Sequence, residues 1–270
     1  MTTAASTRTV REVGLGPVQY TSTLVGFVAA IVLAAVAVAV VTLRPPTDVA
    51  TVVIGGVAIL LMAARGSSAP YRWSLSGLVI LGLTLSAGPV GALVAALAEA
   101  LGVALRTRNG WFRSAFNVAN QFLANSSAWA VFSGIEMLLG RGAPTLLLGA
   151  VAAGLAQSIV KDVLVTAVVH CATPNVPLAR LAEARLKVMP MVPVSSLAGF
   201  CFLVMHNDAG WLGFATLLVP CLFLHEVVLN FRHRESALEE ERGNHRQRQQ
   251  ALLQEMLQAK RTDGEGAEGA

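Results

Sequence analysis

The sequence predicts an all-α fold, a polytopic bundle of transmembrane helices. Of its 270 residues, 54% are apolar and only 13% are charged, whereas about 25% of the residues in a soluble domain are charged. Apolar runs long enough to cross a membrane recur along the chain, and most charges lie between them or after residue 231. We therefore expect an N-terminal cytoplasmic segment (1–23), a helix bundle (24–231) and a charged tail (232–270).

The first two apolar runs are Leu24–Leu43 and Val49–Ala64. Leu24–Leu43 has the length of about 20 residues that a helix needs to cross the hydrocarbon layer. It is not typical of a signal peptide, because it is full length and further apolar runs follow it. Val49–Ala64 is a shorter candidate.

The third apolar run, Ser74–Arg106, contains Gly88-Pro89. Proline cannot continue a helical hydrogen-bond ladder, and the residue before it avoids helical geometry. The run therefore predicts two helices, about 75–87 and 89–105. The first is short for a span, so it either crosses with little tilt or enters the membrane only part way.

The second half of the chain contains four longer apolar runs: Ala115–Leu139, Thr145–Ala172, Val188–His206 and Trp211–Phe231. Between the second and third of these, Leu178–Lys187 is typical of a short amphipathic helix at the membrane surface. The chain thus predicts about eight spans, or seven if the short helix is re-entrant.

The orientation follows from the distribution of Lys and Arg, which stay on the cytoplasmic side of a membrane. With the N-terminus inside and eight crossings, 12 basic residues fall inside and 2 outside, so we expect both termini to be cytoplasmic. The inside set is Arg8, Arg11, Arg65, Arg72, Arg106, Arg108, Arg113, Arg180, Arg185, Lys187, Arg232 and Arg234, and the outside pair is Arg44 and Arg141.

The tail from Arg232 has some helical spacing of leucines, but Gly243-Asn244 interrupts it and a Gly-rich stretch, Thr262–Ala270, follows. A sustained heptad repeat is missing. Two interpretations stay open. The tail is either a short dimerising signalling helix, which would make the chain a homodimer, or a solvated helix that frays before a disordered end.

Ionisable residues within the predicted spans include Glu99, Glu136, Lys161 and Asp162. Such groups are costly in a membrane and each is a candidate functional residue. We expect Lys161 to pair with a carboxylate, either Glu99 or Asp162. The pair could simply hold two helices together, or it could bind a ligand or sense an ion.

The 115–139 span is rich in amides, and Asn117, Gln121 and Asn125 recur every four residues on one helix face. Because amides in lipid need partners, this face should point into the bundle, either for helix-to-helix hydrogen bonds or as the wall of a ligand pocket. The predicted ligand-binding patch combines the two sets of residues: Glu99, Asn117, Gln121, Asn125, Lys161 and Asp162.

The sequence offers no metal or catalytic motif. His225-Glu226 opens a possible H-E-x-x-H zinc motif, but the fifth position is Leu229. The three cysteines match no metal-ligand spacing. We therefore expect no catalytic residue, no metal and no cofactor. The pI near 9.3 reflects membrane orientation rather than nucleic-acid binding, because the basic residues lie between apolar spans.

Two stretches carry a family resemblance. SLSGLVILGLTLSAGPVGALVAALAEALGVALRTRNGWFR leads directly into SAFNVANQFLANSSAWAVF, and a later span reads VKDVLVTAVV. Over about residues 50–234 this resembles the multi-span N-terminal membrane sensor regions of bacterial GGDEF and HD-GYP proteins, which make or degrade cyclic di-GMP. The resemblance carries Asn117 over through Phe116-Asn117, and Lys161 stands where it implies an uncharged amide. A more distant likeness is to the substrate-capturing membrane components of vitamin transporters.

The chain contains no GGDEF or HD-GYP sequence, so the enzymatic activity of those families is not expected here. The resemblance implies a non-catalytic sensory or ligand-binding module in a bacterial plasma (inner) membrane, acting in signal transduction. The alternative is a small-molecule transporter or transporter subunit. Expected partners are the lipid bilayer, a cytoplasmic signalling protein and a second copy of the chain, but not nucleic acid.

Overall fold

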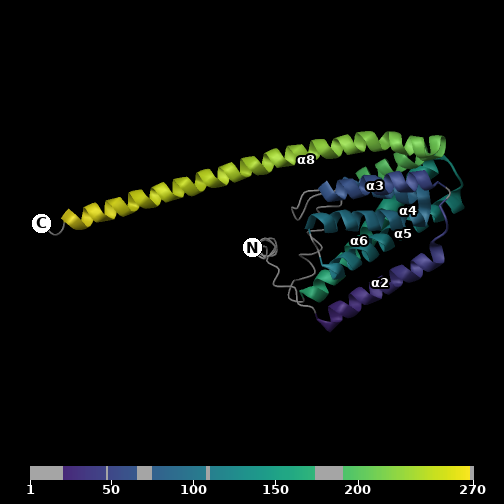
Figure 1. Ribbon diagram of the computed structural model, residues 1–270, viewed down its shortest axis with the longest axis horizontal. Helices are drawn as coiled ribbons and strands as arrows, with labels where there is room; N and C mark the ends of the chain where they lie inside the picture. The colour runs from purple at the N-terminus through teal and green to yellow at the C-terminus, as the bar shows by residue number, and fades with distance from the viewer. Residues whose placement is uncertain (1–20, 47, 66–74, 108–109, 174–190, 268–270) are drawn as a thin grey trace. The chain divides into compact units, whose positions relative to one another are not determined.

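A computed structural model describes residues 21–46, 48–65, 75–107, 110–173 and 191–267 (Figure 1). It divides into two units, Met1–Phe223 and Leu224–Ala270, which are described separately. The described residues form helices and no strands, as expected of an all-α fold. The helices are α2 (Ser22–Thr42), α3 (Val49–Arg65), α4 (Ser76–Thr107), α5 (Trp111–Leu139), α6 (Ala143–Ala172) and α8 (Met191–Ala267).

Five of these helices are long and apolar enough to cross a membrane, namely α2, α4, α5, α6 and the Val192–Phe231 part of α8. Their outward faces carry large apolar side chains, such as Leu33 (69% exposed), Val40 (78%) and Val163 (60%). Apolar surface on this scale is rare on soluble monomers. The all-helical architecture predicted from the sequence is confirmed, and the five long apolar helices are consistent with a membrane-embedded protein. Helix α3, with 17 residues, is shorter than the five.

Local sequence explains where several helices begin. The Thr21 side chain accepts a hydrogen bond from the Leu24 amide (3.2 Å), and Asp48 does the same for Thr51 at the start of α3 (3.1 Å). These side chains satisfy amides that the first turn of a helix leaves without partners. Helix α5 begins at Trp111, four residues before the expected start. The amphipathic helix expected at 178–187 lies outside the described residues.

The chain reverses direction at Gly88, within α4. Gly88 has a φ of 61°, a left-handed value that favours glycine. A Cβ added at Gly91 would collide with the carbonyl oxygen of Leu83, although eight residues separate their Cα atoms by about 12 Å in a straight helix. Helix α4 is therefore a hairpin with a first limb (76–87) and a second limb (89–107). The expected break at Gly88-Pro89 is confirmed.

The same device recurs at Gly210, within α8. Gly210 has a φ of 57°, and a Cβ added at Gly213 would collide with the carbonyl oxygen of Met205. The rings of Phe202 and Phe214 lie 4.7 Å apart, whereas twelve residues of straight helix span about 18 Å. Each reversal thus uses a glycine with positive φ and a second glycine three residues later, which lets the backbone approach a carbonyl closely.

The first limb of α4 is the most enclosed element of the bundle. Every residue from Leu78 to Leu85 is buried, as expected of a helix that is apolar on all faces and surrounded by protein. One side packs with α3 residues such as Ile59 and Met62. Another side packs with Ala128 of α5 and Ala153 of α6.

Small residues let neighbouring helices approach the first limb. A Cβ added at Gly55 of α3 would lie 2.8 Å from a Leu83 methyl group, and one added at Gly199 of α8 would lie 2.9 Å from Leu81. A Cβ added at Gly82 itself would lie 2.7 Å from the Phe202 side chain. Close packing of this kind stabilises helices within membranes, where apolar burial alone provides little driving force.

The connection between α2 and α3 and the Gly210 reversal lie at one end of the first unit, and the residues beside Gly88 line a cavity with that connection. The Thr51 hydroxyl, near the start of α3, lies 3.3 Å from the His206 ring nitrogen, just before Gly210. Gly88 faces the Trp129 indole of α5, ten residues before the end of that helix. At the opposite end, the Arg106 guanidinium donates to the Ala63 carbonyl (3.3 Å), close to the end of α3.

The second unit is a continuous helix that ends at Ala267. It runs through Gly243 and Asn244, which interrupt the leucine spacing, and past Thr262. Neither residue forbids helical backbone, since glycine within a helix costs only about 1 kcal/mol relative to alanine. The question of a dimer through this segment stays a prediction.

Substitution of Gly91 or Gly213 by alanine should destabilise the protein, because each new methyl group would meet a backbone carbonyl that cannot rotate away. We expect a loss of about 1–3 kcal/mol, measured as a lower thermal unfolding midpoint in detergent. Gly77→Ala and Gly134→Ala are matched controls with nothing within 4 Å of the added Cβ. If the two pairs behaved alike, close approach at the reversals would not be what requires glycine.

Candidate functional site

A cavity of about 200 Å³ lies between the second limb of α4, α5 and α6. Each helix contributes one stripe of residues at intervals of three or four, the spacing of side chains on one helix face. We call it the amide cavity. Its lining consists of Ala96, Glu99, Ala100 and Val103 from α4, Asn117, Asn120 and Gln121 from α5, and Lys161 and Val165 from α6.

The amide wall of this cavity is buried. Asn120 is 4% exposed and Gln121 is 5% exposed, and Asn117 is half-buried. The Oδ1 atom of Asn120 has no hydrogen-bond partner among the described residues. Because a buried polar atom without a partner costs about 1–3 kcal/mol, this oxygen is an acceptor that could receive a bound donor.

Two opposite charges face the amide cavity. Glu99 and Lys161 are both half-buried and come from different helices. Within the described part of the chain, neither forms an ion pair closer than 4 Å. The direct pairing of Lys161 with a carboxylate that we expected is therefore not seen, and a cavity lies where that pair would form.

Asn125 continues the amide stripe beyond the cavity and holds three helices together. Its Oδ1 accepts hydrogen bonds from Gln157 of α6 (2.6 Å) and from Gln121 (3.2 Å). Its Nδ2 donates to the Ala92 carbonyl of α4 (3.2 Å). Asn125 is fully buried, so these bonds fix the position of Gln121 at the cavity wall. Asn125 itself does not line the cavity.

Asp162 lies apart from the amide cavity. It follows Lys161 on α6, and adjacent helical side chains point about 100° apart. The Ser158 hydroxyl lies 3.5 Å from Asp162 Oδ2, one turn earlier on the same helix. Asp162 is absent from the lining that Lys161 shares with Glu99. Of the six residues in the predicted patch, the structure thus gathers Glu99, Asn117, Gln121 and Lys161 at one cavity.

The predicted patch left out Asn120, which lines the cavity, and Gln157, which donates a hydrogen bond to Asn125. Asn120 lies three residues after Asn117, a spacing that also places side chains on one face. It was left out because the predicted patch used only the four-residue spacing of Asn117, Gln121 and Asn125. Gln157 lies four residues before Lys161 and so shares its face. In both cases the polar residue was visible in the sequence, and its helical spacing from a chosen residue was the available signal.

A second cavity, of about 430 Å³, lies toward the other end of the bundle. It is lined by the end of α2, the Pro45-Pro46 connection, the Gly88 reversal and Trp129. Its lining includes one ionisable side chain, the exposed Arg44. This cavity is larger but has fewer converging polar groups than the amide cavity, so the latter is the better candidate for specific binding.

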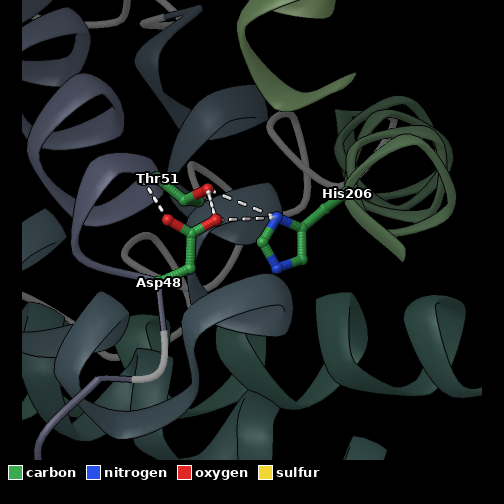
Figure 2. A network of polar contacts seen from close by, with 3 residues as sticks. All are labelled: Asp48, Thr51 and His206. Carbon is green, nitrogen blue, oxygen red and sulfur yellow. Dashed lines mark hydrogen bonds and ion pairs between the residues drawn. The ribbon is translucent and has the colours of Figure 1, made fainter. Parts of the chain in front are cut away.

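A polar network connects the start of α3 with the part of α8 that precedes Gly210 (Figure 2). The Thr51 hydroxyl donates to Asp48 Oδ2 (2.7 Å), and His206 Nδ1 lies 3.3 Å from that hydroxyl and 3.8 Å from the carboxylate. The hydrogen bond from Thr51 lowers the pKa of Asp48, and His206 adds a smaller effect of the same sign. Asp48 directly before an apolar run is a helix-start signal that sequence reasoning passed over.

The remaining charged groups offer no metal site in the part of the chain that the structure describes. No group of three or more His, Cys, Asp and Glu side chains lies close enough there to hold a metal ion. Glu136 pairs with Arg141 at 2.5 Å, but the Arg141 side chain is 84% exposed. Exposed pairs of this kind contribute at most about 1 kcal/mol.

Comparisons with protein-family models, curated proteins and solved structures find no match to this chain.

Acid should destabilise the native protein partly through Asp48. A carboxyl group whose folded-state pKa is lowered adds stability above its unfolded pKa, near 4, and loses it as the pH falls through the folded-state value. Asp48→Asn should therefore lower the unfolding midpoint at pH 7 and flatten its decline between about pH 5 and 3. Asp208→Asn, an exposed change at the same end, should keep the native profile. An unchanged profile for Asp48→Asn would contradict this role.

Proposed function

We propose that this chain is a non-catalytic membrane module that binds a small polar molecule in the amide cavity and signals through cytoplasmic partners. The observation that carries the proposal is the convergence of Glu99, Lys161 and three amides on one cavity inside an apolar bundle. Ionisable groups within a membrane are costly, and they generally mark sites of binding or transport.

The alternative function is transport of the same ligand. Many transporters place their substrate site near the middle of the membrane, between helices that are broken there. Helices α4 and α8 are both interrupted, but the residues at the two interruptions do not line the amide cavity. This position favours a sensing module over a transporter. The likeness to sensor regions of cyclic di-GMP proteins agrees with that choice and rests on the sequence motifs alone.

For the membrane topology, we propose eight crossings in a bacterial plasma membrane with both termini in the cytoplasm. Counting the limbs on either side of Gly88 and Gly210 separately gives eight helical segments. Contacts support an alternating course, since Asn125 of α5 meets Gln157 of α6 while Phe132 meets Gly149. Arg141 would then lie outside and Arg113 inside, in agreement with the excess of Lys and Arg on the proposed cytoplasmic side.

Cysteine labelling in intact cells tests this topology. In a background without the three native cysteines, Arg141→Cys and Asp208→Cys should react with a membrane-impermeant maleimide from outside. Arg113→Cys should react only after the cells are permeabilised. Labelling of Arg113→Cys in sealed cells would show that the orientation is reversed or that a crossing has been miscounted.

Filling the amide cavity tests the binding function. Ala100 is 7% exposed and lines the cavity, whereas its neighbour Leu101 is 52% exposed. In a thermal-unfolding screen of single polar metabolites, at least one compound should raise the midpoint of the native protein and of Leu101→Phe but not of Ala100→Phe. A ligand at a hundred times its Kd adds about 2.7 kcal/mol of stability. If no compound distinguished Ala100→Phe from the native protein, the cavity would not be a binding site.

The screen's best compound then separates the two functions. A sensor should change the rate at which trypsin cleaves the Arg-rich tail when the compound binds, without moving the compound across a membrane. A transporter should carry radiolabelled compound into proteoliposomes. Measurable flux that Ala100→Phe abolishes would replace the sensing proposal with transport.

A further inference from the structure

We infer that the ligand of the amide cavity is a small zwitterion, with an ammonium group at Glu99 and an anionic group at Lys161. This inference rests on the proposed binding function and specifies its chemistry. It starts from the two charges of opposite sign that line one cavity without pairing with each other.

Charge balance selects a zwitterion over a simple ion. A bound cation would compensate Glu99 but leave Lys161 without a counter-charge, and a bound anion would leave Glu99 in the same position. Uncompensated charge is expensive where the dielectric constant is low. A molecule with both charges compensates both side chains and adds no net charge to the interior of the bundle.

The amide wall agrees with this assignment. Asn120 Oδ1 is a buried acceptor without a partner in the described residues, and an ammonium group has three N–H donors to offer. Asn117 and Gln121 each carry an amide nitrogen that can donate to an anionic group. The Nε2 of Gln121 already donates to Asn125 at 3.2 Å, and an amide nitrogen has a second N–H.

The size of the cavity limits the ligand. Its volume of about 200 Å³ is below the range of roughly 300–1,000 Å³ for sites that hold drug-sized molecules. Lys161 lies eleven residues before the end of α6 at Ala172, or about 16 Å into the bundle. Two sources have the required chemistry, a free amino carboxylic acid and the headgroup of phosphatidylethanolamine. The depth favours the free molecule, because headgroups lie outside the hydrocarbon layer.

The test uses the full-length protein in phosphatidylcholine nanodiscs. Binding of glycine, β-alanine, 4-aminobutyrate and 5-aminopentanoate is measured by calorimetry, with propionate and propylammonium as singly charged controls and acetamide as a neutral control. At least one zwitterion should bind, and the singly charged molecules should bind at least about tenfold more weakly. Glu99→Gln and Lys161→Met should each weaken zwitterion binding roughly ten- to a hundredfold, as expected for one charge-assisted hydrogen bond.

Two further variants guard against loss of folding. The exchange Glu99→Lys with Lys161→Glu retains both charges in reversed positions and should restore zwitterion binding to within about tenfold of native. Arg141→Met removes an exposed cation and should leave binding unchanged. Weaker zwitterion binding in phosphatidylethanolamine discs than in phosphatidylcholine discs would identify the lipid headgroup as a competitor with the same chemistry.

Failure can be assigned to one proposal or to both. If acetamide or a single ion bound as well as every zwitterion, and Ala100→Phe abolished that binding, the amide cavity would be a binding site but the zwitterion assignment would be wrong. Zwitterion binding that was insensitive to both charge variants would also overturn the assignment. If none of the probes bound and the metabolite screen found no compound, both proposals would fail.

Discussion

The close approach of backbone to backbone at Gly88-Gly91 is the constraint on which the rest of the first unit depends. Gly88 adopts a φ of 61° at low cost because it has no side chain. For the same reason Gly91 can lie against the Leu83 carbonyl. The reversal places the first limb of α4 inside the bundle, against α3 on one side and α5 and α6 on another. Helix α8 turns by the same arrangement at Gly210-Gly213 and closes over that limb through Phe202 and Gly199.

The hairpin also determines where the amide cavity can form. Because the first limb fills the centre, the second limb presents Ala92 and Ala96 to α2 and α5. Its next turns bring Glu99 and Ala100 to the polar stripe of α5. Asn125 then links the α4 backbone to Gln157 and Gln121. The cavity therefore rests on side chains that are fixed by packing and hydrogen bonds, which favours a specific ligand geometry.

Much of this fold could be read from the sequence, because apolar length and proline have direct physical consequences. The break at Gly88-Pro89 followed from the missing amide of proline, and the helix bounds of α2 and α6 differ from those expected by two residues or fewer at each end. The enclosure of the first limb could not be read in this way. A segment that is apolar on every face has no amphipathic stripe to say which side meets lipid and which meets protein.

The candidate site, like the fold, could be predicted from the sequence only in part. Helical spacing correctly grouped Asn117 with Gln121, because positions on one helix are fixed by geometry. The relation of Glu99 to Lys161 depends on how far apart two helices stand, and small residues such as Ala96 and Ala100 set that separation only in the folded bundle. The predicted ion pair of Lys161 was wrong for this reason. The sequence shows which charged residues share a helix face, but it does not show the distance between two helices.

The gap between Glu99 and Lys161 is itself an argument for binding rather than for structure alone. A direct ion pair with well-placed hydrogen bonds would satisfy both charges and would hold α4 to α6. The bundle already has that link in Asn125 and Gln157, one turn away. Two charges held apart by a cavity add little to stability, yet they present both signs of charge to whatever enters. Natural proteins accept such a loss of stability mainly where a site must stay open for function.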